Sequence, residues 1–143
     1  AALAAELSGL AALVDLDLSR CELQRLPELE GLPSLERADI SRNELVSSRG
    51  LGRCSRLRRL SLAHNRLRRV EELEMLPALE ELDVSHNRLG PTVETAIRPS
   101  AVCTQLRVLC VSENPLTEQG GHVAQLTNLF PSLVLVDART VRP

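Results

Sequence analysis

The sequence predicts an α/β solenoid, a right-handed superhelix of stacked repeats with a parallel concave sheet and short helical or irregular convex segments. The first observation is an eleven-residue pattern, LxxLxLxxNxL, which occurs five times with starts spaced 22, 22, 22 and 27 residues apart. The second is composition, because Leu dominates the apolar residues while Phe occurs once and Trp and Tyr are absent. A core of many similar aliphatic side chains is typical of repeat architectures.

The five matches share one register. The first positions are Leu13, Leu35, Leu57, Leu79 and Leu106, and the ninth positions are Cys21, Asn43, Asn65, Asn87 and Asn114. A short strand alternates its side chains, so we expect the fourth and sixth positions to point inward and the third and fifth to face solvent. The ninth-position Asn is expected to bond backbone groups left unpaired where the chain turns out of the strand.

The pattern is the signature of leucine-rich repeats, and with its 22-residue period the chain resembles their short class. That class is typified by the protein-phosphatase-1 regulatory subunit, the acidic nuclear phosphoproteins, the spliceosomal A-prime protein and an axonemal dynein light chain. The resemblance covers about residues 10–140. Beyond Leu116 the chain resembles the terminal cap of that class, which is commonly a helix followed by LPxLxxLD. The matching residues here are Leu126, Leu129, Phe130, Pro131, Leu133, Val136 and Asp137. This cap departs from the pattern in Phe-Pro for Leu-Pro, in Val136 for the last Leu, and in lacking the usual Gly after Asp137.

We expect one leucine-rich-repeat domain over residues 1–143. It divides into an N-terminal helical cap at 1–12, five repeats at 13–116 and a C-terminal cap at 117–143. Apolar residues at every third position before the second and fourth strands indicate short 3₁₀ or irregular turns on the convex side. The longer fourth return segment contains Pro91 and Pro99, which predict a helical turn over Thr92 to Ile97.

Residues 22 apart should lie side by side on adjacent strands, about 4.8 Å apart. The third-position column is Asp15, Arg37, Arg59, Glu81 and Val108, and the fifth-position column is Asp17, Asp39, Ser61, Asp83 and Cys110. All of these except Val108 are the candidate partner-binding residues. They suit a peptide with Lys or Arg near its ends and a carboxylate or phosphate near its centre. Alternatively, Asp15 with Arg37 and Arg59 with Glu81 neutralise one another across strands.

Other chemistry is weakly supported. The eighth-position column contains His64 and His86, but this is the ordinary polar position before the Asn, so we expect no metal site. The four Cys contain no CxxC pair, and Cys54 and Cys103 fall in a column of buried Leu. Positive charge gathers in the third repeat, in Arg53, Arg56, Arg58, Arg59, Arg66, Arg68 and Arg69. Glu residues nearby neutralise much of that positive charge. The sequence also lacks the Tyr and Trp side chains on which bases stack, so nucleic-acid binding is not favoured.

The sequence therefore predicts a non-enzymatic protein–protein interaction scaffold that binds a partner on its concave face. No catalytic triad or Gly-rich phosphate loop is present, and no cofactor is expected. The expected partner is a protein or peptide with basic character. The resemblance implies two alternatives, a chromatin or histone-tail binding module and an axonemal or microtubule-linked adaptor. No apolar stretch approaches the roughly 20 residues that span a bilayer, and we expect an intracellular location, nuclear or cytoplasmic.

Overall fold

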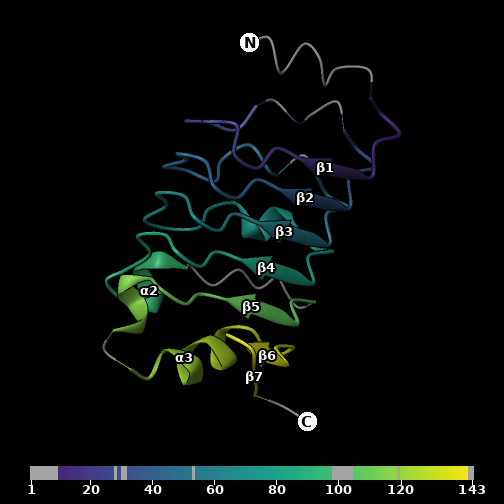
Figure 1. The fold of residues 1–143 in the computed structure, drawn as a ribbon. Coiled ribbons are helices and arrows are strands. Elements are labelled where there is room, and N and C mark those ends of the chain that lie inside the picture. The colour runs from purple at the N-terminus through teal and green to yellow at the C-terminus, as the bar shows by residue number, and fades with distance from the viewer. Residues whose placement is uncertain are drawn as a thin grey trace.

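A computed structural model describes residues 10–27, 29, 32–52, 54–97, 105–118 and 120–141. Short strands stack one below the next from the N-terminal to the C-terminal end, as Figure 1 shows. The strands are β1 (Asp15–Asp17), β2 (Arg37–Asp39), β3 (Arg59–Ser61), β4 (Glu81–Asp83), β5 (Val108–Cys110), β6 (Leu135–Val136) and β7 (Arg139–Thr140). Neighbours in sequence are neighbours in the sheet, so the sheet is open. The pairs from β1 to β6 are parallel, and β7 returns antiparallel to β6. This confirms the predicted solenoid.

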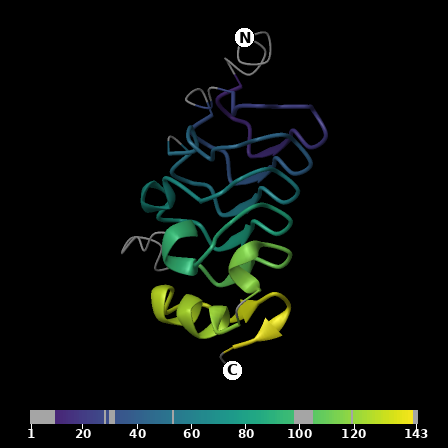
Figure 2. The ribbon, with the colours of Figure 1, turned by 90° about the vertical axis from the view of Figure 1, so that its left-hand side faces the viewer.

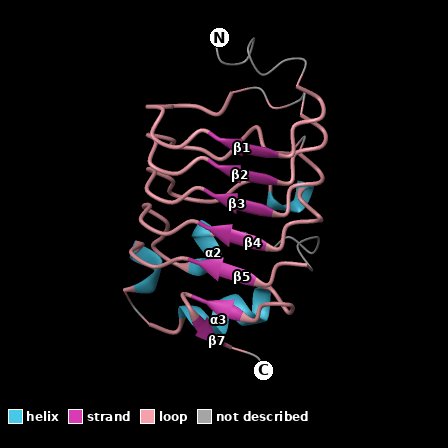
Figure 3. Ribbon diagram, turned by 45° about the vertical axis from the view of Figure 1, so that its right-hand side comes forward, coloured by secondary structure: helices cyan, strands magenta, loops and turns pink. Residues whose placement is uncertain are grey.

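The helical segments lie in the returns between strands (Figures 2 and 3). They are η1 (Leu73–Met75), α2 (Val93–Ala96), η2 (Pro115–Thr117) and α3 (His122–Leu129). The predicted turn over Thr92 to Ile97 is confirmed, with these two residues as the N-cap and C-cap of α2. The Thr92 hydroxyl accepts a hydrogen bond from the Thr95 N–H at 3.2 Å, as an N-cap should. The helix expected at residues 1–10 and the stop expected at Pro99 fall outside the described residues, Leu10 excepted.

The core is a continuous aliphatic column between strands and returns. Alternation along the strands is as predicted, since the middle residue of each of the three-residue strands is buried while its neighbours are more exposed. Cys54 is fully buried in the same column as Leu32 and Leu76, which confirms its reading as a small hydrophobe. The single Phe, Phe130, is buried at the C-terminal end of the column, directly after α3.

The buried ninth-position asparagines form a ladder of hydrogen bonds between adjacent repeats, at the turns that follow the strands. Asn65 illustrates it: its amide nitrogen donates to the carbonyls of Ile40 at 3.1 Å and Leu62 at 3.0 Å. Its amide oxygen accepts from the N–H of Leu45 at 3.0 Å. Asn43, Asn87 and Asn114 make equivalent bonds. Each Asn thus ties its own turn to the preceding repeat, and the predicted role is confirmed.

One backbone feature accompanies the ladder. The residue before the ninth position adopts a left-handed conformation in every repeat, with φ between 55° and 57° in Arg20, Arg42, His64, His86 and Glu113. Non-glycine residues rarely adopt this conformation. The five side chains therefore leave the backbone in the same direction in each repeat, on the side of the concave face where the strands end.

At the C-terminal end of the stack, α3, β6 and β7 follow the fifth strand. One carboxylate oxygen of Asp137 accepts hydrogen bonds from the N–H groups of Val111 at 2.7 Å and Ser112 at 3.0 Å, at the end of β5. Ala138 stands where the related cap usually has Gly, and its φ of 65° is left-handed. An alanine thus adopts a backbone conformation that favours glycine.

Candidate interaction surface

The predicted columns are brought together on the concave face. Register pairs Asp15 with Arg37, Arg37 with Arg59 and Arg59 with Glu81, and it pairs the fifth-position residues in the same way. All the candidate residues except Asp17 line one shallow groove of about 400 Å³. Ala38, Leu60 and Leu82 also line it, between the two columns. Asp17, on β1, lies beside Asp39 of β2 but does not line the groove.

The third-position charges pair across strands. Arg37 Nε lies 3.0 Å from a carboxylate oxygen of Asp15, and Arg59 Nε lies 3.5 Å from one of Glu81. Both pairs are exposed, so each contributes little to stability and is screened by salt. The alternative of mutual neutralisation is therefore what these four side chains do in the unbound chain.

The fifth-position carboxylates behave differently, because each is held by a serine two residues further on. In Asp17, Asp39 and Asp83, Oδ1 accepts from a serine N–H at 2.9–3.0 Å and from the same serine hydroxyl at 2.6 Å. The serine partners are Ser19, Ser41 and Ser85. The serine hydroxyl and N–H also lower the pKa of Asp17, because both hydrogen bonds favour the carboxylate.

The second oxygen of each of these aspartates has no hydrogen-bond or ion-pair partner in the described part of the chain. We call Asp17, Asp39 and Asp83 the acidic row. Sequence reasoning placed the row but missed its serines. The signal was present as the triplet Asp-x-Ser in three repeats, replaced by Ser61-Leu62-Ala63 in the third.

The concave face is acidic in balance. The groove and Asp17 bring together five carboxylates and two guanidinium groups, which leaves three negative charges. Toward the C-terminal end the lining changes to Val108 and Cys110. Burial, and then the negative charges of Asp83, Asp137 and Glu81, raise the pKa of the Cys110 thiol. The face thus combines an acidic half on β1 to β4 with a more apolar end at β5.

The rim beside the acidic row carries a stacked histidine pair. The rings of His64 and His86 lie 4.1 Å apart at 8° to each other. Burial lowers the pKa of His64, and the neighbouring His86 and Arg42 lower it further. Within the described ranges, no group of three or more His, Cys, Asp or Glu side chains is placed to hold a metal ion.

Some arginines of the third repeat form ion pairs with nearby glutamates, as the sequence indicates. Arg58 lies between Glu80, at 2.8 Å, and Glu36, at 3.8 Å. Arg66 pairs with Glu44 at 3.1 Å. Among the described residues, Arg56, Arg68 and Arg69 form no ion pair, and Arg53 lies outside those residues.

In the ranges that the structure describes, none of the helices has the length and apolar character needed to cross a bilayer.

An open parallel sheet of short strands, stacked at a 22-residue period and joined by an asparagine ladder, defines a solenoid of the interaction-scaffold type. The family model for leucine-rich repeats matches residues 30–143. The chain belongs to the leucine-rich-repeat family. That fold generally serves protein–protein interaction and not catalysis. Among curated proteins, none matches this sequence closely enough to be counted as a relative.

Solved structures agree with this assignment. The chain is similar to a structure of the Drosophila melanogaster SNF/U2A′ complex, with 26% identity, a TM-score of 0.80, and coverage of 90% of this chain and 74% of that one. It resembles internalin C2 from Listeria monocytogenes in fold, at 22% identity and a TM-score of 0.75, covering 94% of this chain and 54% of that one. The leucine-rich-repeat domain of Mex67 from Chaetomium thermophilum matches at 26% identity and a TM-score of 0.55, covering 62% of this chain and 60% of that one.

Proposed function

We propose that the chain is a scaffold that binds a basic, extended segment of a partner protein along its concave face. The observation that carries this proposal is the acidic row, in which a serine fixes one oxygen of each carboxylate while the other is free to accept a hydrogen bond. A fixed acceptor loses little conformational entropy when a ligand binds, so preorganisation favours affinity.

The spacing of the row suits a peptide that runs along the solenoid axis. Asp39 and Asp83 are separated by one strand, hence by about 9.6 Å, which is twice the inter-strand distance. Three residues of an extended chain in the polyproline II conformation also span about 9.3 Å, and they bring side chains three positions apart to the same side. Lys or Arg side chains three positions apart would therefore reach Asp39 and Asp83, with a small polar residue over Ser61. A carboxylate or phosphate near the centre of the peptide would face Arg37 and Arg59.

Similarity to known structures supports a protein partner in general terms. The similar U2A′ chain was solved in a complex with SNF, and proteins that use a preformed concave surface commonly bind partners this way. A histone tail is one basic segment with the required chemistry, so a chromatin-binding role is a special case of the same proposal. Nothing in the acidic row favours an axonemal or microtubule-linked role, which stays a prediction, as does a nuclear or cytoplasmic location.

The test is an isosteric substitution that removes the negative charge but keeps the serine contacts. The triple variant Asp17→Asn, Asp39→Asn and Asp83→Asn retains an oxygen acceptor for each serine but removes three negative charges. The probe is a fluorescein-labelled extended peptide with Lys at every third position, measured by fluorescence polarisation at 0.15 M salt. We expect the triple variant to bind it at least tenfold more weakly.

The matched control removes the same charge elsewhere. Glu74, Glu94 and Glu118 are exposed, and their side chains hold no hydrogen bond or ion pair in the described ranges, so their change to Gln alters net charge equally. Glu71 and Glu72 are unsuitable, because both carboxylates bond the preceding repeat. Equal weakening by both triples would mean that overall charge governs binding, and the proposal would be abandoned. A wild-type chain that does not bind the peptide would also reject it.

A further inference from the structure

A second groove lies on the flank of the solenoid, between the asparagine turns and the convex returns. It spans three consecutive repeats and has a volume of about 630 Å³. Its lining follows the 22-residue register, with Gln24, Val46 and Arg68 in one column and Arg25, Ser47 and Arg69 in the next. We call it the flank groove. None of the concave candidate residues lines it.

The floor of the flank groove is apolar and open to solvent. Val46 is 64% exposed, which is the highest exposure of a large hydrophobic side chain in the described part of the chain. Leu26, half-buried, continues this floor on the preceding repeat. The other outward positions of the second repeat carry mostly polar side chains. A valine at the centre of such a groove gives a bound aliphatic side chain a place to be buried.

Guanidinium groups surround this floor. Arg25, Arg68 and Arg69 are exposed, and none of their guanidinium groups lies within 4.0 Å of a carboxylate among the described residues, although Arg69 attracts Glu71 over a longer distance. Arg49 also lines the groove, where Glu71 holds it at 2.7 Å. Four guanidinium groups against one carboxylate leave three positive charges, the opposite of the concave face.

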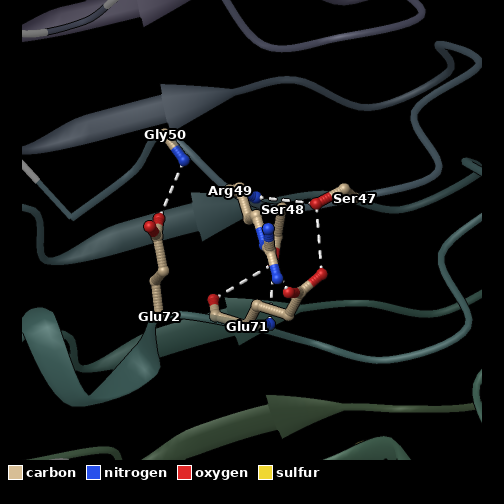
Figure 4. A network of polar contacts seen from close by, with 6 residues as sticks. All are labelled: Ser47, Ser48, Arg49, Gly50, Glu71 and Glu72. Carbon is tan, nitrogen blue, oxygen red and sulfur yellow. Dashed lines mark hydrogen bonds and ion pairs between the residues drawn. The ribbon is translucent and has the colours of Figure 1, made fainter.

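The groove has a rigid wall. Arg49 and Glu71 come from adjacent repeats, and Ser47 Oγ donates a hydrogen bond to the same Glu71 carboxylate at 3.1 Å, as Figure 4 shows. The buried Ser48 hydroxyl bonds the backbone of Glu71 in both directions. These contacts fix the segment that carries Val46 against the segment that carries Arg68 and Arg69. The charges and the apolar floor are therefore held together before any ligand arrives.

We propose that the flank groove is a second interaction surface, which binds an acidic peptide segment of a partner protein through one aliphatic side chain on Val46 and flanking carboxylates on Arg25, Arg68 and Arg69. Guanidinium groups pair with carboxylates in a planar, bidentate geometry, which gives direction to such a contact. The apolar floor favours a peptide over a nucleic-acid backbone, and the chain has no Trp or Tyr on which bases could stack. This surface is independent of the acidic row and does not rest on the function proposed for it.

The experiment uses a fluorescein-labelled peptide of alternating Asp and Glu with one central Leu, measured by fluorescence polarisation against the full chain. The test variant is Arg25→Gln, Arg68→Gln and Arg69→Gln. The control variant is Arg56→Gln, Arg107→Gln and Arg139→Gln, which removes the same charge from exposed arginines outside the groove. We expect at least a tenfold loss of affinity in the test variant and less than a threefold loss in the control.

A second pair of measurements isolates the apolar contact. Val46→Ser should weaken binding of the Leu peptide several-fold but leave a peptide with Ser in place of Leu unaffected. Equal losses in the two Arg triples, or no discrimination between the Leu and Ser peptides, would overturn the proposal. Tighter binding of a single-stranded oligonucleotide of equal charge at the same arginines would overturn it in favour of a nucleic-acid surface. Circular dichroism melting of each variant establishes that loss of binding is not loss of fold.

Discussion

The Nε of Arg49 lies 2.7 Å from a carboxylate oxygen of Glu71, and these residues occupy equivalent places in adjacent repeats, 22 positions apart. The contact belongs to a larger set in which Ser47, Ser48 and the Gly50 N–H also bond the third repeat (Figure 4). Solenoid stability is largely a sum of contacts between neighbouring repeats. These polar contacts therefore fasten the second repeat to the third on the side away from the sheet.

Glu71→Ala should lower the free energy of unfolding by about 0.5–1.5 kcal/mol, the usual net value of lost hydrogen bonds. The change removes the acceptor for Ser47 and Arg49, and Glu71 is itself only partly exposed. Urea denaturation followed by circular dichroism measures the effect. Glu74→Ala is the control, because Glu74 is exposed and its loss should change stability by less than about 0.5 kcal/mol. Equal effects of the two substitutions would show that the contact adds nothing.

The same contact should depend on pH. The hydrogen bond from Arg49 is the main cause that lowers the pKa of Glu71 from its ordinary value of 4.5. A lowered pKa in the folded state stabilises the fold above the unfolded pKa, and this contribution is lost as pH falls through the folded pKa. The stability difference between the wild type and Glu71→Ala should thus be full at neutral pH and shrink below pH 4.5. A difference that stays constant down to pH 3 would contradict this origin.

Asn65→Ala should cost about 1–3 kcal/mol, because it leaves buried backbone groups of a central repeat without partners. The groups are the N–H of Leu45 and the carbonyls of Ile40 and Leu62. Thermal and urea unfolding measure the loss, and Arg56→Ala, at an exposed position without an ion pair, is the matched control. An unchanged midpoint for Asn65→Ala would mean that the ladder does not stabilise this turn.

The repeat period made most of the fold and the concave columns predictable. Once Leu13, Leu35, Leu57 and Leu79 are aligned, a separation of 22 residues dictates which side chains stand side by side, whatever their chemistry. The pairing of Asp15 with Arg37 follows directly. The same alignment predicted the asparagine ladder, because an amide side chain, which both donates and accepts, can satisfy the unpaired backbone groups of the turn.

The repeat period does not predict which partner each side chain bonds. Asp39 and Arg37 both face the concave side. Asp39 bonds the serine two residues further on, whereas Arg37 reaches back to Asp15 on the preceding strand. The exposure of Val46 was equally hidden, since it depends on the path of the return segment and not on the strand pattern. The contacts and exposure of residues outside the repeat motif could therefore be learned only from the structure.

Ala138→Gly should stabilise the chain by about 0.5 kcal/mol. The left-handed conformation at φ 65° costs a non-glycine residue about 1 kcal/mol, and the greater freedom of glycine in the unfolded chain offsets part of the gain. Ala124→Gly is the control of opposite sign, because Ala124 lies exposed within α3, where glycine costs up to about 1 kcal/mol. Differential scanning calorimetry of the two variants measures both shifts. Destabilisation by Ala138→Gly would show that the alanine contributes contacts that outweigh its backbone strain.

The cysteines provide a chemical readout of burial and charge. The thiolate is the reactive form, so a raised pKa slows alkylation at neutral pH. Burial raises the pKa of Cys54 to about 11. Cys110 faces the concave side, as expected, but it is only partly exposed and its pKa is also raised. Cys21 is exposed. Of these three thiols, we therefore expect that of Cys21 to react most readily.

Iodoacetamide at pH 8 should alkylate Cys21 first, Cys110 more slowly, and Cys54 only when the chain unfolds, as timed peptide mapping by mass spectrometry would show. The charge contribution can be separated from burial with Asp83→Asn. Because the negative charge of Asp83 helps to raise the pKa of Cys110, its removal should speed labelling of Cys110 and leave the rate at Cys21 unchanged. An unchanged Cys110 rate would mean that the charge of Asp83 does not slow its reaction. Fast labelling of Cys54 in the folded chain would contradict its place in the core.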